Sequence, residues 1–192
     1  MPLNNRRRWV TVLSLIPALS LFALMAWALA RDIGNPEGLG INSHLGENPT
    51  TNSEIPDFSV VSIDGEHITP KNLEGKVVMF DFWSSWCPPC RAEAASLSQV
   101  YLEYHNESVE FVGIAIWDDE KDVLAFVQDF NVPYPNAIDL EGIIAIDFGV
   151  SGIPEKFFVD GSGTIIKKFV GPMNTNKLRS ILNEMLAVGK AE

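Results

Sequence analysis

Hydrophobic residues are distributed in two different ways along the chain. Residues 9–30 form one uncharged apolar run of 22 residues, whereas from Ile55 onward short apolar runs alternate with amphipathic stretches. About 20 apolar residues are enough for a helix to span a bilayer. The intervening residues 31–54 are rich in Gly, Asn, Pro, Ser and Thr, a composition typical of flexible linkers. The pattern predicts a membrane segment over residues 1–30, a linker over 31–54 and a folded domain over 55–192.

Inside the predicted domain, the period of the apolar residues changes repeatedly between that of a strand and that of a helix. Asp64-Gly65 and residues 160–163 are turn signals between short apolar runs, and each predicts a hairpin. The apolar run 77–83 is continuous, which is typical of a central strand covered on both faces. Further strands are predicted over 109–117 and around Ala137-Ile138, and helices over 88–105, 120–130, 140–148 and 175–188, the second of them capped by Asp118 and Asp119.

This order of elements predicts an α/β fold. A hairpin comes first, strand–helix–strand units follow, and a second hairpin and a helix close the chain. Strands joined through helices run parallel, whereas strands joined by a tight turn run antiparallel. The domain should therefore contain a mixed central sheet with helices on both faces.

Charge is divided unevenly along the chain. The formal net charge is -11 at pH 7, yet Arg6, Arg7 and Arg8 precede the apolar run and all 25 acidic residues follow it. A domain this acidic is not expected to bind nucleic acid or an anionic membrane surface, and it suits a basic partner. Arginines before the apolar run place the N-terminus in the cytoplasm and the domain on the outer side of the membrane.

A cleaved signal peptide is the alternative interpretation of the first 30 residues, because Ala28-Leu29-Ala30 has the form of a small-x-small cleavage site. The apolar region of a signal peptide usually spans only about 7–15 residues, so the sequence favours an uncleaved anchor. Both alternatives export the folded domain, and in both the cysteines work outside the reducing cytosol.

The only two cysteines of the chain, Cys87 and Cys90, follow directly on the predicted central strand and open the predicted helix 88–105. Two cysteines at this spacing can close and reopen a disulfide. Attack on a disulfide requires a thiolate, which the unpaired N–H groups of a helix N-terminus favour. We therefore expect Cys87 to be an exposed, acidic thiol and Cys90, one turn inside the helix, to be its resolving partner.

A zinc site, a structural disulfide and a pair of unrelated thiols each fit the two cysteines less well. A zinc site would need two further ligands, and His44, His67 and His105 are not in paired spacing. A structural disulfide usually closes a longer loop. Two unrelated thiols would not account for the flanking tryptophan and prolines. We therefore expect neither a metal ion nor an organic cofactor.

Two segments carry a family resemblance: residues 82–91, FWSSWCPPCR, and residues 149–160, GVSGIPEKFFVD. Together with the order of elements, they resemble the thioredoxin superfamily. The predicted anchor, the hairpin before the redox strand and the extra segment 118–144 make residues 55–188 similar to one subgroup. That subgroup is the membrane-anchored, TlpA/ResA/DsbE-like thiol–disulfide oxidoreductases of bacteria. The resemblance implies a thioredoxin-like fold with an N-terminal hairpin extension and an inserted segment.

The resemblance also implies roles for residues near the cysteines. Pro154 should be a cis-proline opposite them, although cis is otherwise the minority state of X–Pro bonds. The backbone of its neighbour Ile153 should pair with the bound substrate, and Trp86, Pro88 and Pro89 should form the surface around the disulfide.

Two acidic residues are candidate proton carriers. Asp81 interrupts the apolar strand six residues before Cys87, and burying an ionisable group is costly unless it is used or paired. It matches the buried acid of thioredoxins, whereas the cytochrome-maturation relatives more often carry an amide there. Glu93, one turn beyond Cys90, matches an acid near the resolving cysteine of the anchored subgroup. Because Glu is a good helix former, a solvent-exposed structural position is the alternative.

The sequence predicts an extracytoplasmic thiol–disulfide oxidoreductase. Cys87 attacks a substrate disulfide, and Cys90 then releases the reduced substrate from the mixed disulfide. By resemblance, the reaction is a reduction in cytochrome c maturation. Its client would be the haem-binding Cys-x-x-Cys site of an apocytochrome c, and a membrane thiol-electron transporter would be the reductant.

Three alternative functions make different demands on the sequence. A general extracytoplasmic disulfide reductase or oxidase would act on other clients. A peroxiredoxin would need a Pro-x-x-x-Thr-x-x-Cys motif, but Phe80 and Ser84 stand at the proline and threonine positions. A thioredoxin-like copper-binding protein would have a wider cysteine spacing and a downstream histidine, and no histidine follows His105.

Overall fold

The computed structural model describes residues 16–17, 19–25, 27, 45–48, 53–106 and 108–189. The chain divides into two units, Met1–Ser43 and His44–Glu192. In the first unit the described residues are helical and their side chains are exposed. The predicted membrane segment lies largely outside the described residues. Within the described part of the chain, no helix is long and apolar enough to cross a membrane.

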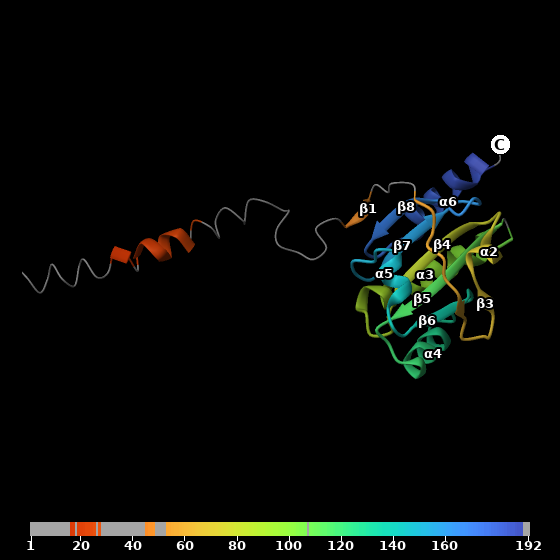
Figure 1. Ribbon diagram of the computed structural model, residues 1–192, viewed down its shortest axis with the longest axis horizontal. Helices are drawn as coiled ribbons and strands as arrows, with labels where there is room; N and C mark the ends of the chain where they lie inside the picture. Colours follow the sequence, from red (N-terminus) through yellow and green to blue (C-terminus); the bar gives the residue numbers. More distant parts are fainter. Residues whose placement is uncertain are drawn as a thin grey trace, which may run out of the picture. The chain divides into compact units, whose positions relative to one another are not determined.

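A six-stranded mixed sheet runs through the second unit (Figure 1). Its strands are β1 (Gly46–Asn48), β4 (Val77–Trp83), β5 (Val109–Ile116), β6 (Asn136–Asp139), β7 (Glu155–Val159) and β8 (Ile165–Val170). They lie in the order β1-β8-β7-β4-β5-β6. β4 pairs in parallel with β5, and β5 with β6, whereas the pairs β4–β7, β7–β8 and β1–β8 are antiparallel. The predicted mixed sheet with a central strand over 77–83 is confirmed.

Helices cover both faces of the sheet, and each face has its own hydrophobic core. Met79 and Trp83 of β4 point to the first face and Phe80 and Phe82 to the second, because side chains alternate along a strand. The first face carries α3 (Pro88–Tyr104), α4 (Glu120–Asp129) and α6 (Thr175–Gly189). The second carries α2 (Pro70–Leu73), α5 (Ile143–Asp147) and the predicted hairpin of β2 (Val60–Val61) and β3 (His67–Ile68).

An aromatic cluster holds the second face together. Phe58, Phe80, Phe82, Phe148 and Phe157 contact one another with ring centroids between 5.0 and 6.1 Å apart. Such pairs contribute about 0.5–1.5 kcal/mol each beyond the burial of their area. The cluster therefore fixes the segment before β2 and the end of α5 against the central strands.

Two predicted boundaries differ from the structure. Strand β1 lies inside the predicted linker 31–54, because the edge of β8 offers unpaired backbone groups and Glu47 forms ion pairs with Lys167 and Lys177. Helix α5 begins at Ile143 rather than at residue 140, because Gly142 takes a left-handed conformation with φ of 71°.

The predicted side-chain cap of α4 is wrong. Asp119 occupies the N-cap position, but its side chain makes no capping hydrogen bond. The carboxylate of Asp118 instead accepts hydrogen bonds from the backbone N–H and the hydroxyl of Ser85. This acidic residue therefore fixes the loop that leads to the cysteines rather than the helix that follows it.

Candidate active site

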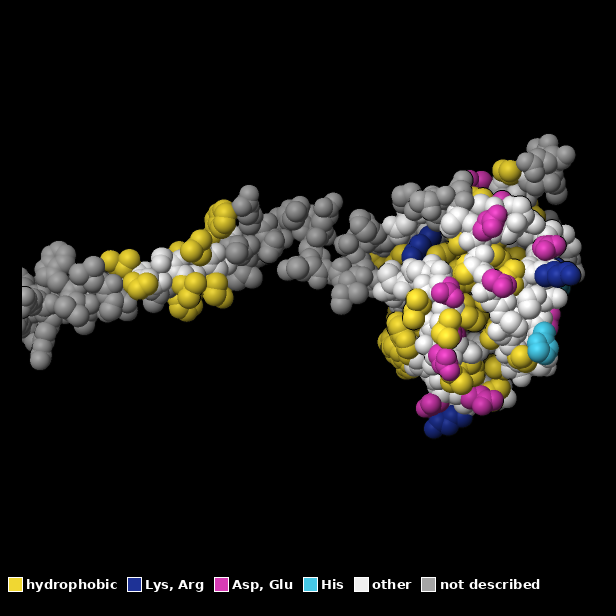
Figure 2. Space-filling model, viewed as in Figure 1, with side chains coloured by type: hydrophobic (Ala, Val, Ile, Leu, Met, Phe, Trp, Pro, Cys, Tyr) yellow, Lys and Arg dark blue, Asp and Glu magenta, His cyan; other side chains and the backbone are white. Residues whose placement is uncertain are grey.

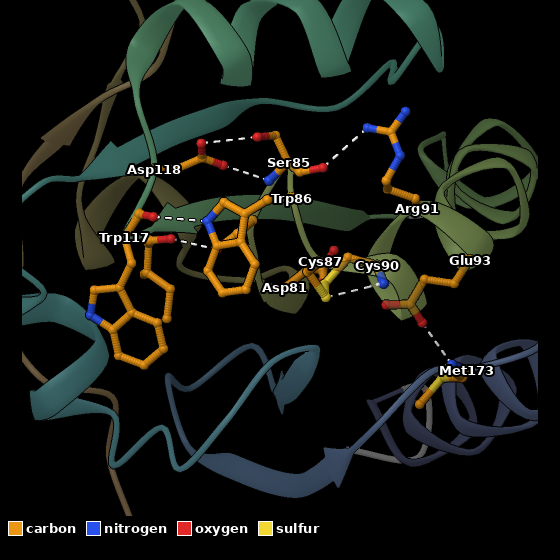
Figure 3. Close-up of a disulfide and its surroundings, with 12 residues drawn as sticks. Asp81, Ser85, Trp86, Cys87, Cys90, Arg91, Glu93, Trp117, Asp118 and Met173 are labelled. Carbon is orange, nitrogen blue, oxygen red and sulfur yellow. Dashed lines mark hydrogen bonds between the residues drawn. A yellow bond between two sulfur atoms is a disulfide. The ribbon is translucent and has the colours of Figure 1, made fainter.

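The two cysteines lie where β4 passes through a short loop into α3 (Figure 3). They form a disulfide with their Cα atoms 5.3 Å apart. Cys87 is the N-cap residue of α3, and its Sγ accepts a hydrogen bond of 3.3 Å from the backbone N–H of Cys90. A helix N-terminus stabilises negative charge on a nearby sulfur. After reduction, this geometry favours the thiolate at Cys87 over Cys90.

The expected exposure of Cys87 is wrong for this oxidised state. Cys87 is 2% exposed and Cys90 is 3% exposed. Both are packed in the first hydrophobic core with Trp83 and Ala94, and Ile153 packs against the same core. Trp86 and Pro88, by contrast, are exposed and Pro89 is half-buried. The redox loop thus presents an exposed rim over a covered disulfide.

Hydrogen bonds from three sides hold the redox loop. In addition to the contacts of Ser85 with Asp118, the Ser84 hydroxyl donates to the carbonyl of Ile116. Arg91 donates to the Ser85 carbonyl over 3.1 Å and stacks its guanidinium over the Phe130 ring, 4.9 Å from the centroid. These contacts fix the backbone on which Trp86 and Cys87 sit.

The Ile153–Pro154 peptide bond is cis, as predicted. It directly precedes β7, whose first residue, Glu155, pairs with Phe82 near the end of β4. The cis bond therefore lies at the same end of the sheet as the cysteines. Pro154 is buried and Ile153 is half-buried, and the Pro154 carbonyl accepts a 2.8 Å hydrogen bond from the N–H of Gly171.

The segment before the cis bond is held by a buried carboxylate. Glu155 is fully buried and forms an ion pair with Lys168. Its Oε2 also accepts hydrogen bonds from the Ser151 N–H, 3.0 Å, and from the Ser151 hydroxyl, 3.1 Å. Glu155 therefore orders the turn that carries Ile153.

A second charged group lies behind the disulfide, on the first face of the sheet. Lys156 Nζ lies 3.3 Å from Asp81 Oδ1 and forms a hydrogen-bonded ion pair with Glu93 Oε1. The other oxygen of Glu93 accepts a 2.6 Å hydrogen bond from the backbone N–H of Met173. All three ionisable residues are buried: Asp81 is 3% exposed, Glu93 4% and Lys156 0%. The alternative prediction, that Glu93 is a solvent-exposed structural residue of the helix, is therefore wrong.

The charges of this group do not balance when both carboxylates are ionised, because one ammonium faces two negative groups. Burial raises the pKa of Asp81, and the nearby Lys156 opposes that rise. Burial likewise raises the pKa of Glu93 to about 7, with Lys156 opposing and Asp81 adding to the rise. Burial and both carboxylates also raise the pKa of Tyr134 well above its ordinary value. The interior beside α3 therefore holds a proton near neutral pH.

Sequence reasoning missed Lys156. It lies in a strand whose other residues are apolar apart from Glu155, and the register of β4 and β7 places it directly opposite Asp81. A lysine inside an apolar strand is a signal, since a buried lysine requires a partner. Its partners could not be assigned without the register. In the described residues, no group of three or more His, Cys, Asp or Glu side chains could hold a metal ion.

The arrangement suits reversible dithiol chemistry. A disulfide that starts a helix can be opened to a nucleophilic thiol and a buried one, and an internal proton carrier lies beside the buried one (Figure 3). Exposed aromatic and proline side chains surround the first thiol.

Known proteins share this fold and this kind of chemistry. A solved structure of a putative thiol:disulfide interchange protein DsbE from Chlorobium tepidum is 25% identical, covers 74% of this chain and 99% of that chain, and has a TM-score of 0.65. The structure of DsbF from Mycobacterium tuberculosis is 30% identical with a TM-score of 0.63, covering 67% of this chain and 95% of that chain.

Curated relatives agree with the structural neighbours. The thiol-disulfide oxidoreductase ResA of Bacillus thuringiensis is 33% identical over 134 residues, which cover 69% of this chain and 76% of that protein. The thiol:disulfide interchange protein DsbE of Escherichia coli is 31% identical over 172 residues, covering 88% of both chains. A model of the AhpC/TSA family matches residues 51–168. With its thioredoxin-like fold and its Cys87–Cys90 disulfide, the chain belongs to the AhpC/TSA family and is a thiol–disulfide oxidoreductase similar to ResA and DsbE.

Proposed function

We propose that this oxidoreductase is an extracytoplasmic reductase of protein disulfides that acts in cytochrome c maturation. The observation that carries the proposal is the Cys87–Cys90 disulfide at the start of α3, set between an exposed Trp86 and the cis bond of Pro154. An exposed rim around a redox disulfide suits a polypeptide client, which can lie across the rim while its own disulfide is attacked.

The reaction transfers two electrons from the enzyme dithiol to the client disulfide. The Cys87 thiolate attacks one client sulfur, so an enzyme–client S–S bond forms and the client disulfide breaks. The first client thiolate takes a proton from solvent. The Cys90 thiolate then attacks Cys87 Sγ, which re-forms the enzyme disulfide and releases the second client thiolate. The oxidised state described here is the end of this sequence.

Cys90 must lose its proton before it can attack. It is buried and lies inside the first turn of α3, whereas Cys87 stands at the helix end, so direct transfer of the Cys90 proton to bulk water is hindered. The carboxylates of Asp81 and Glu93 lie on the same side of the sheet as Cys90, and Glu93 is one helical turn further along α3. We assign to this pair, held by Lys156, the role of proton acceptor, because its ionised member has a raised affinity for a proton near neutral pH.

The proposed location rests on the N-terminal segment. Arg6, Arg7 and Arg8 precede the apolar run 9–30, which supports a single-pass anchor with the oxidoreductase domain on the outer side. The similarity to DsbE covers 88% of this chain, which is more than the folded unit His44–Glu192 alone. The N-terminal segment is therefore partly shared with that relative.

The proposed client and reductant follow from the resemblance of residues 55–188 to the anchored TlpA/ResA/DsbE-like proteins. The client is the oxidised haem-binding Cys-x-x-Cys site of an apocytochrome c. Electrons return to Cys87 and Cys90 from a membrane thiol-electron transporter. The acidic chain, with its net charge of -11, favours a basic client.

Trapping of the mixed disulfide tests whether Cys87 is the attacking cysteine and Cys90 the resolving one. With Cys90→Ser, the mixed disulfide cannot be resolved, so client adducts should accumulate in native membranes; with Cys87→Ser they should not. Adducts are detected by non-reducing gels and identified by mass spectrometry. Adducts rich in apocytochromes c support the proposed client. Equal trapping by both variants would contradict the assignment of Cys87 as nucleophile, and adducts that contain only other proteins would point to a general disulfide reductase.

Stability across pH tests the buried proton. The folded protein holds a proton on Glu93 up to about pH 7, whereas the unfolded chain releases it near the ordinary value of 4.5. Because this folded pKa is raised, the contribution of Glu93 to wild-type stability falls as pH rises from about 4.5 to 7. Glu93→Gln removes the titration, so its free energy of unfolding relative to wild type should rise over that window and level off above it. Urea unfolding at closely spaced pH values measures the difference.

The matched control for that series is Glu103→Gln. Glu103 is an α3 carboxylate whose pKa is lowered by the hydrogen bonds from Arg179. A group with a lowered folded pKa stabilises the protein above its unfolded pKa. The relative stability of the control should therefore fall, not rise, as pH increases through about 4.5. A flat or falling profile for Glu93→Gln would show that the pKa of Glu93 is not raised in the folded protein, and would contradict the buried proton.

Fractionation tests the proposed location. The full-length protein should stay in the membrane pellet after carbonate extraction, because an apolar run of this length holds a helix in the bilayer. Protease added to spheroplasts should degrade the oxidoreductase domain. A mature protein that begins near Arg31 would show a cleaved signal peptide instead, and protection of the domain in intact spheroplasts would contradict an outward orientation.

A further inference from the structure

Large apolar side chains are exposed beside the disulfide. Trp86 is 57% exposed, Trp117 60%, Leu140 76%, Ile143 53% and Ile146 74%. We call these five residues the tryptophan surface. In the space-filling view, hydrophobic side chains gather over α5 and the start of α3, with acidic side chains among them (Figure 2). Isolated exposed apolar residues are ordinary, but a contiguous set marks an interaction site.

The five residues are contiguous because the fold connects them. The Trp86 indole donates a 2.9 Å hydrogen bond to the Trp117 carbonyl, and the Trp86 ring lies between Trp117 and Cys87 in Figure 3. Parallel β5 and β6 pair Ile116 with Asp139, so Trp117 and Leu140, each one residue beyond its strand, lie at the same end of the sheet.

The surface continues from there onto α5. A Cβ atom added to Gly142, the N-cap residue of α5, would lie 3.8 Å from the indole nitrogen of Trp117. The Trp117 ring therefore lies over the start of this helix. Ile143 and Ile146 follow one turn apart on α5, and a spacing of three places both on one helix face. The tryptophan surface thus runs from the rim of the disulfide to the exposed face of α5.

Trp117 adopts an unusual backbone conformation beside the redox loop. Its φ is 52°, in the left-handed region that bulky residues rarely enter. Such a conformation is unfavourable and persists when the surroundings or the function require it. Here the indole is mostly exposed, so the burial of the ring does not compensate. The conformation instead turns a large aromatic side chain outward next to the redox loop.

The charges around the tryptophan surface are predominantly negative. From Trp117 to Phe148 the chain has eight acidic residues and one basic residue, Lys121. The exposed acidic residues Glu141 and Asp147 directly follow two of its members in the chain, and the exposed Asp119 lies two residues after Trp117. Arg91 lies on the other side of the redox loop from Trp117, where it is engaged with Ser85 and Phe130 (Figure 3).

We propose that the tryptophan surface binds the part of the client polypeptide that flanks its cysteine pair, and that it selects segments in which apolar residues alternate with lysine or arginine. The inference rests on the proposed reduction of protein disulfides and adds a substrate preference to it. The apolar side chains of the client contact the two indoles and α5, while its basic groups meet the acidic rim. A second copy of this acidic chain or an anionic lipid surface would be repelled by the same rim.

Three model substrates separate the contribution of apolar contacts to client binding from the contribution of charge. Each is a peptide with one oxidised Cys-x-x-Cys site; the first has Leu and Lys flanks, the second replaces Leu by Ser, and the third replaces Lys by Glu. Bis(2-hydroxyethyl) disulfide is the small-molecule reference. The dithiol form of the purified full-length protein should reduce the first peptide on the order of tenfold faster, as kcat/KM, than either of the others.

Two surface variants test the site on the protein. The double variant Ile143→Ser/Ile146→Ser changes no residue that holds the disulfide. The variant Trp117→Asn removes the indole and introduces a residue that tolerates the backbone φ of 52° at this position. Each should lower kcat/KM for the first peptide about five- to tenfold, mainly through KM, and so abolish its advantage over the second peptide. The double variant should reduce the small disulfide at the wild-type rate. Leu102→Ser is the control, because Leu102 is 58% exposed on α3 but lies outside the tryptophan surface.

Each outcome decides between alternatives. Equal rates for the three peptides, or surface variants that behave like Leu102→Ser, would overturn the proposed surface and leave the reductase function intact. Failure of the wild-type dithiol to reduce any peptide or the small disulfide would overturn the proposed function itself. A wild-type dimer in sedimentation that both surface variants abolish, without an effect on peptide reduction, would show that a second copy covers the surface and would also overturn the proposal.

Discussion

One buried lysine between two buried carboxylates is the interaction on which the redox site depends. Moving three ionisable groups into the interior costs several kcal/mol for each, and only their mutual contacts offset that cost. Lys156 neutralises one carboxylate, and the second is accommodated by a proton, which agrees with the raised pKa values of Asp81 and Glu93. The same contacts link the segments that carry the chemistry. Asp81 lies on the strand that leads to Cys87, Glu93 follows Cys90 on α3, and Lys156 follows Pro154.

The exposed side of the site is built by a different set of forces. Hydrogen bonds to Ile116 and Asp118 hold the redox loop at the end of β5, Arg91 holds it from α3, and Glu155 orders the turn before the cis bond. Rigid support of this kind keeps the two thiols in one geometry while a client polypeptide binds, reacts and leaves. The protein thus has a hydrogen-bonded polar scaffold behind the loop and an apolar, acidic-rimmed surface beside it, which agrees with the proposed reduction of basic polypeptide clients.

Local patterns in the sequence were sufficient to predict the redox motif, the central strand and the burial of Asp81, and the family resemblance of residues 149–160 implied the cis-proline. Each of these depends on neighbours in the chain or on a motif whose residues are consecutive. The partner of Asp81 could not be predicted, because Asp81 and Lys156 are brought together by the register of two strands that are far apart in the chain. The burial of Cys87 was missed for a similar reason, since Ile153 and the first hydrophobic core cover it. The burial of Glu93 depends on its ion pair with Lys156 of β7 and on the backbone N–H of Met173, which no local pattern encodes.

The rate at which the mixed disulfide is resolved, measured across pH, tests most directly whether the Lys156-held carboxylates accept the Cys90 proton. Cys87 is loaded with a chromophoric thiol while Cys90 is kept reduced, and release of that thiol is followed by stopped flow for wild type, Asp81→Asn and Glu93→Gln. If the carboxylates accept the proton, at least one variant should release the thiol on the order of tenfold more slowly at neutral pH, with the defect shrinking as pH approaches the pKa of the thiol itself. Superimposable pH–rate profiles for all three folded proteins would contradict that role and leave the buried group with a structural function only.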